Sequence, residues 1–182
     1  MIIDGVTYID PTAWVDPRAE IGQGAKIWNW TKVREGVRIG RDCSIGQCAY
    51  IDVGVVLGHD CRIQNSVQIY KGVTIGNQVY VGPNVTFSND KYPRAYNSNW
   101  TLVKTTVEDG ASIGAGAVIV CGVRLGAFCM VGAGSVVTAD VPRFGLVVGQ
   151  PARLVDYVNI RGVPVAHDMT RPAPDEAWLR AV

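Results

Sequence analysis

A large aliphatic residue, or once a phenylalanine, recurs at every sixth position over most of this 182-residue chain. The first series is Ile9, Val15, Ile21, Ile27, Val33, Ile39, Ile45, Ile51, Leu57, Ile63, Ile69, Ile75, Val81 and Phe87, and the second is Val107, Ile113, Ile119, Leu125, Val131 and Val137. Neither the period of a helix nor the period of two of a strand produces a six-residue repeat. A fixed short period indicates a solenoid, and hexapeptides of this kind predict an all-β fold, the parallel β-helix.

A second register accompanies the first, because the residue two positions before each large one is small or slim. Examples are Ala25, Thr31, Cys43, Cys61, Val67, Ala117, Cys129 and Ser135. We expect the large residue to fill the middle of each coil and the small one to face inward near a corner, where there is little room. Glycine often follows the large residue, as at Gly22, Gly40, Gly82 and Gly114, and there we expect turns with positive φ.

The repeat sets the predicted domain organisation. Three hexapeptides make one triangular coil, so the repeat positions predict about seven coils. The register breaks between Phe87 and Val107, and the polar, aromatic segment 88–106 is predicted to be a loop that protrudes from one corner. Long loops inside compact repeats are usually functional. We therefore expect a β-helix domain over residues 1–141, with this inserted loop, and a short C-terminal extension over residues 142–182.

Composition narrows the class of protein. The net charge of +1 gives no reason to expect a nucleic acid or an anionic membrane surface as partner. The first ten residues lack a basic region followed by a long apolar run, and no stretch approaches eighteen consecutive apolar residues, so we expect neither a signal peptide nor a membrane span. Cys43, Cys61 and Cys129 fall on the small inward register. They are expected to be reduced core residues of a cytoplasmic protein.

Several segments together resemble a known family. They are KIWNW at 26–30, CRIQNSVQIY at 61–70, VGPNVTFSNDKYPRA at 81–95, VCGVRLGAFCMVGAGSVVTADVP at 120–142 and VVGQPARLV at 147–155. These segments resemble the left-handed β-helix acyltransferases, and among them the N-acetyltransferases of nucleotide-linked 3-amino sugars in bacterial surface polysaccharide (lipopolysaccharide) pathways. The resemblance covers residues 6–160. It implies a left-handed helix, a homotrimer with active sites between subunits, acetyl-CoA as co-substrate without a metal, and a UDP- or dTDP-linked amino sugar as acceptor.

The loop lacks a residue that related O-acetyltransferases use. Many of them carry a histidine directly before a proline, and here Tyr92 precedes Pro93. A hydroxyl acceptor needs a base because its own pKa is far above neutrality. An amine with a pKa near 8 is already about one-tenth neutral at pH 7. The sequence therefore favours an amine that attacks the thioester directly, with positioning as the main contribution of the enzyme.

Asn84, at the base of the loop, is the predicted catalytic residue, which would orient the amine or the developing oxyanion. Its simpler interpretation is an asparagine that caps a turn. The predicted substrate-binding residues are Gln64, Asn65, Tyr70, Asn89, Lys91, Tyr92 and Arg94. Lys91 and Arg94 would pair with a diphosphate or a uronic carboxylate, and Tyr92 or Tyr70 would stack on the base or the sugar ring. Each of them is equally a common solvated turn or loop residue.

For coenzyme A, small residues in the second repeat block would let a thin pantetheine arm lie along an edge of the β-helix. They are Gly114, Ala115, Gly116, Ala133 and Gly134, although turns alone would also require them. Arg153 is the predicted phosphate ligand, because the matching basic residue in related acyltransferases lies beside the coenzyme. Arg124 is a second candidate, and a surface salt bridge is the simpler interpretation of both.

Three alternatives remain at this point. An O-acetyltransferase would use His59 as base, reaching toward a neighbouring subunit, although an exposed turn histidine is the simpler interpretation. A γ-type carbonic anhydrase needs three zinc-binding histidines, whereas the chain has two, His59 and His167. A purely structural solenoid would show regular faces and no irregular loop. The sequence does not separate UDP from dTDP or a uronic acid from a 6-deoxy sugar, although Lys91 and Arg94 favour an acid-bearing UDP sugar.

Overall fold

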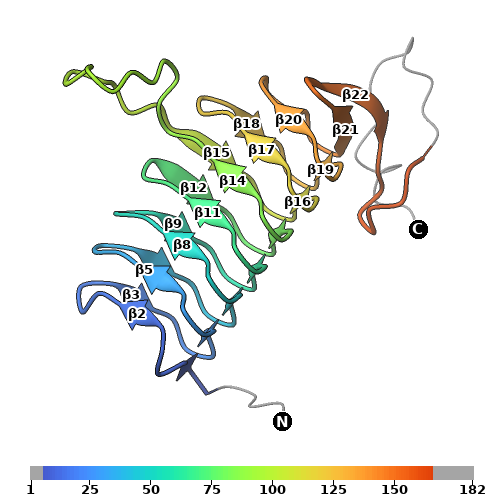
Figure 1. Ribbon diagram of the computed structural model, residues 1–182. Helices are drawn as coiled ribbons and strands as arrows, with labels where there is room; N and C mark the ends of the chain where they lie inside the picture. The colour runs from blue at the N-terminus through green and yellow to red at the C-terminus, as the bar shows by residue number, and fades with distance from the viewer. Residues whose placement is uncertain (1–5, 166–182) are drawn as a thin grey trace.

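The computed structural model describes residues 6–165 and shows a stack of triangular coils built from short strands, with no helix in that range (Figure 1). Sheet A contains β1 (Tyr8–Ile9), β4 (Lys26–Ile27), β7 (Ser44–Ile45), β10 (Arg62–Ile63), β13 (Tyr80–Val81), β16 (Ser112–Ile113), β19 (Met130–Val131), β21 (Gly145–Gly149) and β22 (Ala152–Tyr157). Sheet B contains β2 (Trp14–Val15), β5 (Lys32–Val33), β8 (Tyr50–Ile51), β11 (Gln68–Ile69), β14 (Thr86–Phe87), β17 (Val118–Ile119) and β20 (Val136–Val137). Sheet C contains β3 (Glu20–Ile21), β6 (Arg38–Ile39), β9 (Val56–Leu57), β12 (Val73–Ile75), β15 (Thr105–Val107) and β18 (Arg124–Leu125).

The strands pair in the register that the repeat predicts. Ile9 lies opposite Ile27, and Ile27 lies opposite Ile45, so each coil consumes three hexapeptides. Every strand pair is parallel except β21 with β22, which form an antiparallel hairpin. Because β21 continues sheet A beyond β19, it adds a level above the predicted coils. The predicted fold class is confirmed: a parallel β-solenoid consistent with the left-handed β-helix of hexapeptide repeats.

The core follows the two predicted registers. The large repeat residues from Ile27 to Val137 are buried, and the small ones beside them, such as Cys61 and Ser135, are buried too. Burial raises the pKa of the Cys129 thiol to about 12, so this thiol stays protonated at neutral pH. The first coil is the exception, since the side chain of Ile9 is 42% exposed because no further described coil covers it.

The glycines that follow the large residues do not have positive φ, and this prediction is wrong. Positive φ occurs two positions later, at glycines such as Gly36 and at other residues such as Asn84. The earlier glycines are required by close backbone approach instead. A Cβ added at Gly40 would lie 2.6 Å from the carbonyl carbon of Gly58 in the next coil, and one added at Gly82 would lie 2.7 Å from the nitrogen of Ala115.

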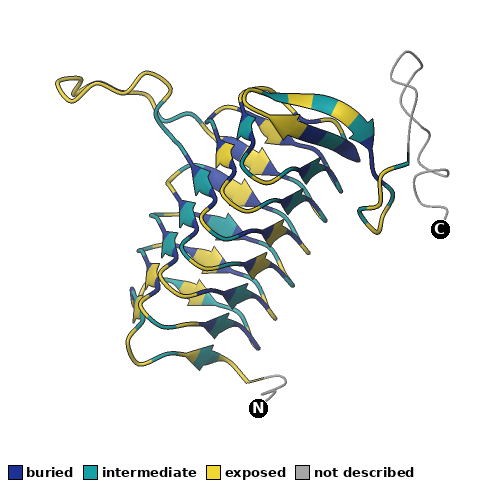
Figure 2. Ribbon diagram, turned by 45° about the vertical axis from the view of Figure 1, so that its right-hand side comes forward, coloured by how far each residue is buried: buried dark blue, intermediate teal, exposed yellow. Residues whose placement is uncertain are grey.

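Three corners connect the sheets, and each has its own role. We name them by the sheets they join: the AB corner, the BC corner and the CA corner. The protruding loop leaves the BC corner after β14 and returns at β15 (Figures 1 and 2). Because β15 begins at Thr105, the irregular segment covers residues 88–104. Leu102 packs over Gly72, where an added Cβ would approach the leucine to 3.0 Å.

Gly40→Ala is expected to destabilise the fold by about 3 kcal/mol, because the new methyl group would have to separate two coils whose backbones are in contact. The matched control is Gly36→Ala, where φ is +67° but nothing lies within 4 Å of an added Cβ. This change costs only the left-handed backbone strain, about 1 kcal/mol. Urea unfolding of both variants measures the difference, and equal losses would contradict close approach as the reason for the first glycine.

Candidate functional site

Most predicted site residues lie in one column along the AB corner. From Cys48 onward, one backbone N–H in each coil there donates to a carbonyl of the preceding coil. Asn84 donates to Asn65 at 3.0 Å, and Gly116 donates to Pro83 at 2.8 Å. One coil further, Gly134 donates to the carbonyl of Ala115 at 2.8 Å. The column therefore brings together the predicted catalytic asparagine, the side-chain amides of Gln64 and Asn65 in the preceding coil, and the small residues assigned to coenzyme A.

Asn84 differs from the asparagine below it in the column. The side chain of Asn65 accepts a hydrogen bond from the backbone N–H of Gln47 at 3.1 Å and so caps a turn. Asn84 has a φ of 59°, which asparagine tolerates well. Its backbone is held in the column, but within the described part of the chain its exposed side-chain amide makes no hydrogen bond. The turn-capping role therefore belongs to Asn65, and the amide of Asn84 is available for a ligand.

Gln64 is the third polar residue of this part of the column. It lies one position before Asn65, directly after β10, and it is half-buried. Its backbone N–H donates to the carbonyl of Val81 at 2.9 Å, which ties it to the coil that carries Asn84. The structure thus groups Gln64 with Asn84, as the sequence predicted.

The upper part of the AB corner is bare backbone. A Cβ added at Gly114 would lie 2.5 Å from the nitrogen of Ala133, so this position admits only glycine. Gly116 and Gly134 have positive φ and open space around them, with nothing within 4 Å of an added Cβ. Together with the exposed methyl groups of Ala115 and Ala133, they form a smooth strip along which a thin, flexible chain can lie.

The β21–β22 hairpin rests on the top of this strip. The side-chain amide of Gln150 donates to the carbonyl of Gly134 at 2.7 Å, and the backbone N–H of Gly149 donates to the hydroxyl of Ser135 at 3.1 Å. Arg153 pairs with Val148 across the hairpin and is exposed. The predicted phosphate ligand therefore stands at the upper end of the column.

The second candidate, Arg124, lies elsewhere. It projects from sheet C, where its guanidinium forms an ion pair with Glu108, and its backbone N–H donates to Asp140 at 2.8 Å. This arrangement is the surface salt bridge that was its simpler interpretation. Arg124 is therefore withdrawn as a coenzyme ligand.

The other predicted substrate residues lie at the BC corner, away from Asn84 in the same chain. Tyr70 is on the corner itself, and Asn89, Lys91, Tyr92 and Arg94 belong to the loop that leaves it. Figure 2 shows the loop extending from the body, and Tyr92 is 75% exposed. Sheet B separates the two corners. Within one chain the structure thus forms two half-sites rather than one.

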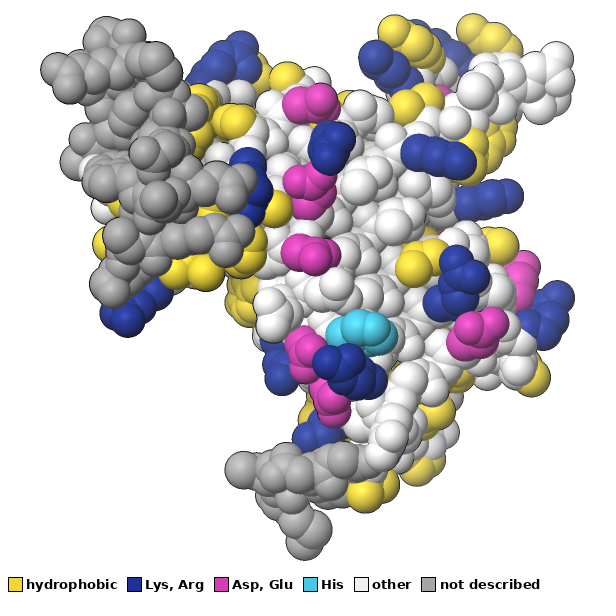
Figure 3. Space-filling model, turned by 180° about the vertical axis from the view of Figure 1, so that it is seen from behind, with side chains coloured by type: hydrophobic (Ala, Val, Ile, Leu, Met, Phe, Trp, Pro, Cys, Tyr) yellow, Lys and Arg dark blue, Asp and Glu magenta, His cyan; other side chains and the backbone are white. Residues whose placement is uncertain are grey.

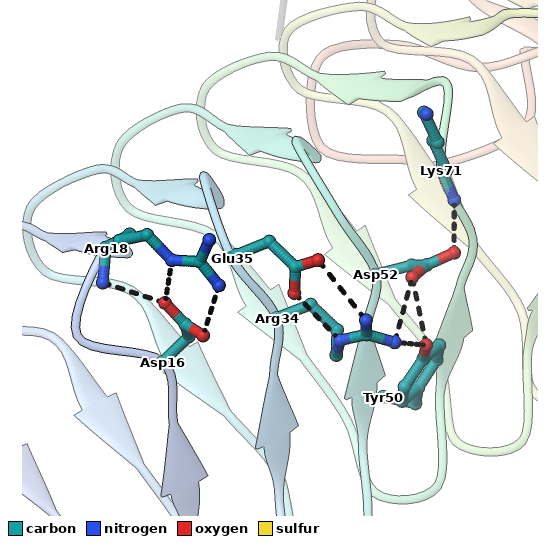
Figure 4. Close-up of polar contacts among 7 residues, drawn as sticks. All are labelled: Asp16, Arg18, Arg34, Glu35, Tyr50, Asp52 and Lys71. Atoms are coloured by element: carbon teal, nitrogen blue, oxygen red, sulfur yellow. Dashed lines mark hydrogen bonds and ion pairs between the residues drawn. The ribbon is translucent and has the colours of Figure 1, made fainter.

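A charged network that the sequence reasoning missed lies on the BC corner below the loop (Figure 4). Asp16 accepts two hydrogen bonds from the guanidinium of Arg18, each at 2.9 Å. Arg34 donates to Glu35 at 3.0 Å and lies 3.8 Å from the carboxylate of Asp52. The signal was present in the sequence, since the acid, base and acid at 16, 34 and 52 recur at the coil period and follow a sheet B strand each time.

His59 lies on the third corner, the CA corner, and is part of a capping ladder. Its ring Nδ1 accepts a hydrogen bond from the backbone N–H of Arg41 at 3.1 Å, and the backbone N–H of His59 donates to the side-chain oxygen of Asn77 at 2.8 Å. Since Nδ1 is an acceptor, the neutral ring carries its proton on Nε2. In this tautomer Nε2 is a hydrogen-bond donor, so it does not act as a base. Figure 3 shows this face, where Arg41 pairs with Asp42 and Asp60 beside the histidine.

Metal-binding clusters and membrane-spanning helices are both absent from residues 6–165. These residues contain no group of three or more His, Cys, Asp or Glu that could hold a metal ion. No helix with the length and hydropathy needed to cross a membrane occurs in the same range. His167 and the tail from residue 166 onward lie outside the described residues.

Comparisons with known proteins agree with this geometry. A family model described as bacterial transferase hexapeptide (six repeats) matches residues 18–52, 54–89 and 104–139, and a model for the hexapeptide repeat of succinyl-transferase matches residues 36–71. A dTDP-3-amino-3,6-dideoxy-alpha-D-galactopyranose 3-N-acetyltransferase of Aneurinibacillus thermoaerophilus is 56% identical over 55 residues, which is 30% of this chain and 29% of the relative. A galactoside O-acetyltransferase of Lactococcus lactis is 33% identical over 88 residues, 46% of this chain and 42% of the relative. The chain thus matches less than half the length of these curated relatives.

Among solved structures, a hexapeptide-repeat acetyltransferase of Vibrio cholerae complexed with acetyl coenzyme A superposes with a TM-score of 0.54. It is 28% identical, and the match covers 67% of this chain and 70% of that one.

The pKa of the Asp16 carboxyl is lowered to about 2 by hydrogen bonds from Arg18, first from its side chain and then from its backbone N–H. A depressed carboxyl pKa stabilises the fold above the unfolded value of 3.8, and this contribution is lost as the pH falls toward 2. Asp16→Asn is therefore expected to lower the free energy of unfolding at pH 7, with the deficit shrinking between pH 4 and pH 2. Urea unfolding across this range measures it. A deficit that stays constant with pH would contradict the assignment. Arg18→Ala removes the guanidinium but keeps the backbone N–H, so it should show a smaller deficit with the same dependence on pH.

Proposed function

The chain belongs to the hexapeptide-repeat family of bacterial transferases, and from this we propose that it is an acetyl-CoA-dependent N-acetyltransferase that acts on the 3-amino group of a UDP- or dTDP-linked sugar. The observation that carries the proposal is the AB corner, where a free asparagine amide lies directly below a smooth backbone strip. A relative that matches part of the chain acts, by its name, on a dTDP-linked 3-amino sugar. A similar solved structure holds acetyl coenzyme A. The pathway would be that of a bacterial surface polysaccharide, in the cytoplasm.

The reaction needs a neutral amine beside a thioester. The nitrogen lone pair of the amine attacks the thioester carbonyl, the N–C bond forms, and the C–S bond breaks as the thiolate of coenzyme A leaves. The surplus proton on nitrogen passes to the departing thiolate or to water. Asn84 would hold the amine through its side-chain carbonyl or the oxyanion through its NH₂ group. No histidine is needed, because a sugar amine is partly neutral at physiological pH.

Acetyl-CoA would lie along the upper part of the AB corner. Its pantetheine arm would follow the strip from Gly114 to Gly116 and then Ala133 and Gly134, where no side chain obstructs it. Arg153, at the top of the column, would bind a phosphate group of the coenzyme. The thioester would then be delivered next to Asn84.

A trimer would complete the acceptor side of the site. Among the outward residues of sheet B only Lys32 is charged, whereas Glu20, Arg38 and Arg124 project from sheet C. If three copies pack with sheet B of each copy facing a three-fold axis, cyclic symmetry places the AB corner of one copy against the BC corner of the next. The partner's loop would thereby bring Asn89, Lys91, Tyr92 and Arg94, together with Tyr70, to the amide of Asn84.

His59 is not supported as the base of an O-acetyltransferase. Its Nδ1 is occupied by a backbone N–H, and it lies on the CA corner rather than on either corner beside sheet B. Within residues 6–165, a hydroxyl acceptor would therefore have no histidine base beside Asn84.

Thiol release from acetyl-CoA, measured across UDP- and dTDP-linked 3-amino and 4-amino sugars and their hydroxyl analogues, tests the proposal. Release is expected with a 3-amino compound and not with the matching hydroxyl compound, because the neutral amine is nucleophilic as it stands, whereas the hydroxyl needs a base to remove its proton. The preferred member of the panel also identifies the nucleotide. Release with hydroxyl acceptors alone would overturn the proposal.

Two variants test the assignment of roles. Asn84→Gly removes the amide while keeping the φ of 59° accessible, and should lower kcat about 100-fold, as expected for loss of an oriented donor at the reacting atoms. His59→Ala should leave kcat within a few-fold of wild type, since the ring serves a turn. The opposite pattern, with activity lost at His59 and retained at Asn84, would return the histidine to the mechanism.

A further inference from the structure

The protruding loop contains a cavity of about 270 Å³, which we call the loop pocket. Its lining includes two aromatic rings, two carboxamides, a cation and a hydroxyl, which belong to Trp100, Tyr92, Asn97, Asn99, Lys91 and Thr101. Only Lys91 and Tyr92 of these have a role in the proposed reaction. Pockets that hold a whole drug-sized ligand begin at about 300 Å³, so the loop pocket suits one ring system of a longer ligand.

The loop is held at its stem, on the BC corner. The backbone N–H of Val103 donates to the carbonyl of Asn89 at 3.2 Å, which joins the two ends of the loop. Leu102 packs over Gly72 in the coil below, and Val103 packs against Gly122 in the coil above, where an added Cβ would lie 3.0 Å from the valine Cγ1. The stem is therefore wedged between two coils, and the loop pocket is carried by a fixed base.

The loop pocket presents groups that the chain itself does not use. The Oδ1 of Asn97 accepts the backbone N–H of Asn99 at 3.0 Å, which fixes this side chain. Within residues 6–165, the Nδ2 of Asn97, the side-chain amide of Asn99 and the indole N–H of Trp100 make no hydrogen bond, and no ring or cation lies against the Trp100 indole. A free ring face beside free amide donors and acceptors matches the two ways in which proteins bind a nucleobase, by stacking and by hydrogen bonds to its edge.

A cation accompanies the rings of the loop pocket. The Nζ of Lys91 lies 5.9 Å from the ring centroid of Tyr92, and in the described part of the chain it forms no ion pair. The neighbouring Asp90 does not neutralise it, because the Asp90 Oδ1 accepts the backbone N–H of Tyr92 at 2.9 Å. Figure 3 shows hydrophobic and basic side chains together at the upper right, where the loop protrudes. Such a surface suits a flat base that is followed by phosphates.

We propose that the loop pocket holds the pyrimidine base of the acceptor, stacked on Trp100, with Lys91 beside the diphosphate. This rests on the proposed function for the identity of the acceptor and for the position of its amine. One copy then holds the nucleotide and presents the sugar amine to Asn84 of the partner subunit. Tyr92 and Tyr70 contact the ribose or the sugar ring.

The adenine of acetyl-CoA is the competing occupant, since it too is a base next to phosphates. The loop leaves the body after β14, in the same coil that carries Asn84, whereas Arg153 lies at the upper end of the column. Phosphates bound at Arg153 keep the adenine at that end and leave the loop pocket to the acceptor.

Trp100→Ala and Trp100→Phe test the assignment, with Tyr96→Ala as the matched control. Tyr96 belongs to the same loop and is 85% exposed, but it does not line the loop pocket. For Trp100→Ala we expect the KM of the nucleotide sugar to rise about tenfold, the range of one lost base–aromatic stack, with kcat and the KM of acetyl-CoA unchanged. Trp100→Phe should recover most of the loss, and Tyr96→Ala should leave all three constants unchanged.

Titration calorimetry on the full chain, with UDP and dTDP and with uridine and thymidine, tests binding without turnover. Trp100→Ala should weaken a nucleotide and its nucleoside by the same factor, about tenfold, because both carry the base. Lys91→Gln should weaken the nucleotide alone, because the nucleoside has no phosphate. Equal weakening of both ligands by Lys91→Gln would contradict its place beside the diphosphate.

The outcomes separate this proposal from the one on which it rests. An unchanged KM for the nucleotide sugar in Trp100→Ala, or an equal rise in Tyr96→Ala, would overturn the loop pocket alone. A rise confined to the KM of acetyl-CoA would also overturn it and assign the cavity to adenine. Dissociation of the oligomer in light scattering, with both KM values changed, would make Trp100 a subunit contact instead. If wild type acetylates no amino sugar, the proposed function fails, but binding of UDP or dTDP that Trp100→Ala abolishes would even then support the loop pocket.

Discussion

The parallel backbone ladder between successive coils is the constraint on which the rest of this structure depends. Outside the loop and the hairpin, each strand residue lies opposite the residue eighteen positions earlier, as with Ile27 opposite Ile9, so a side chain in one coil packs against its equivalent in the next. The ladder also brings backbones together at the corners, where a methyl group on Gly40 or Gly114 would collide with the following coil. Sequence choice is therefore fixed at the inward positions and at the corner glycines. It is free only on the outer faces and at the exposed corner positions.

That freedom explains why the candidate site is linear. A triangular prism packed with aliphatic side chains has no room for a deep pocket, and its corners are the places where residues can differ from coil to coil without disturbing the core. At the AB corner the third residue after each large aliphatic one has positive φ, and the chain places Trp30, Cys48, Ser66, Asn84, Gly116 and Gly134 there in turn. The order runs from aromatic through short polar to bare backbone. An extended ligand meets a different chemistry at each coil.

The fold was predictable from the sequence because the repeat records the ladder directly. The six-residue period predicted the coils, and the small residues two positions before each large one predicted which neighbouring positions are buried. The reason for the glycines after the large residues was misread, because a single coil considered alone does not reveal the backbone of the next one. The loop was expected to protrude from one corner, and it does so at the BC corner, but the separation of that corner from Asn84 depends on the order of the sheets. The roles of His59 and Asn65 could not be predicted, because they depend on hydrogen bonds between coils, and these link residues eighteen positions apart.

The same geometry limits the chemistry that one copy can perform. The AB corner offers an amide, a backbone strip and aromatic rings, and the BC corner offers the cations of the loop, with sheet B between them. A reaction that needs a histidine base would require a residue that neither corner provides within residues 6–165, since His59 lies on the CA corner with its Nδ1 occupied. A reaction that needs two extended substrates requires only a straight corner whose residues differ from coil to coil, and a second surface that holds the substrates against it. Acyl transfer to an amine is of this second kind, because the nucleophile is activated by its own pKa and the protein supplies position.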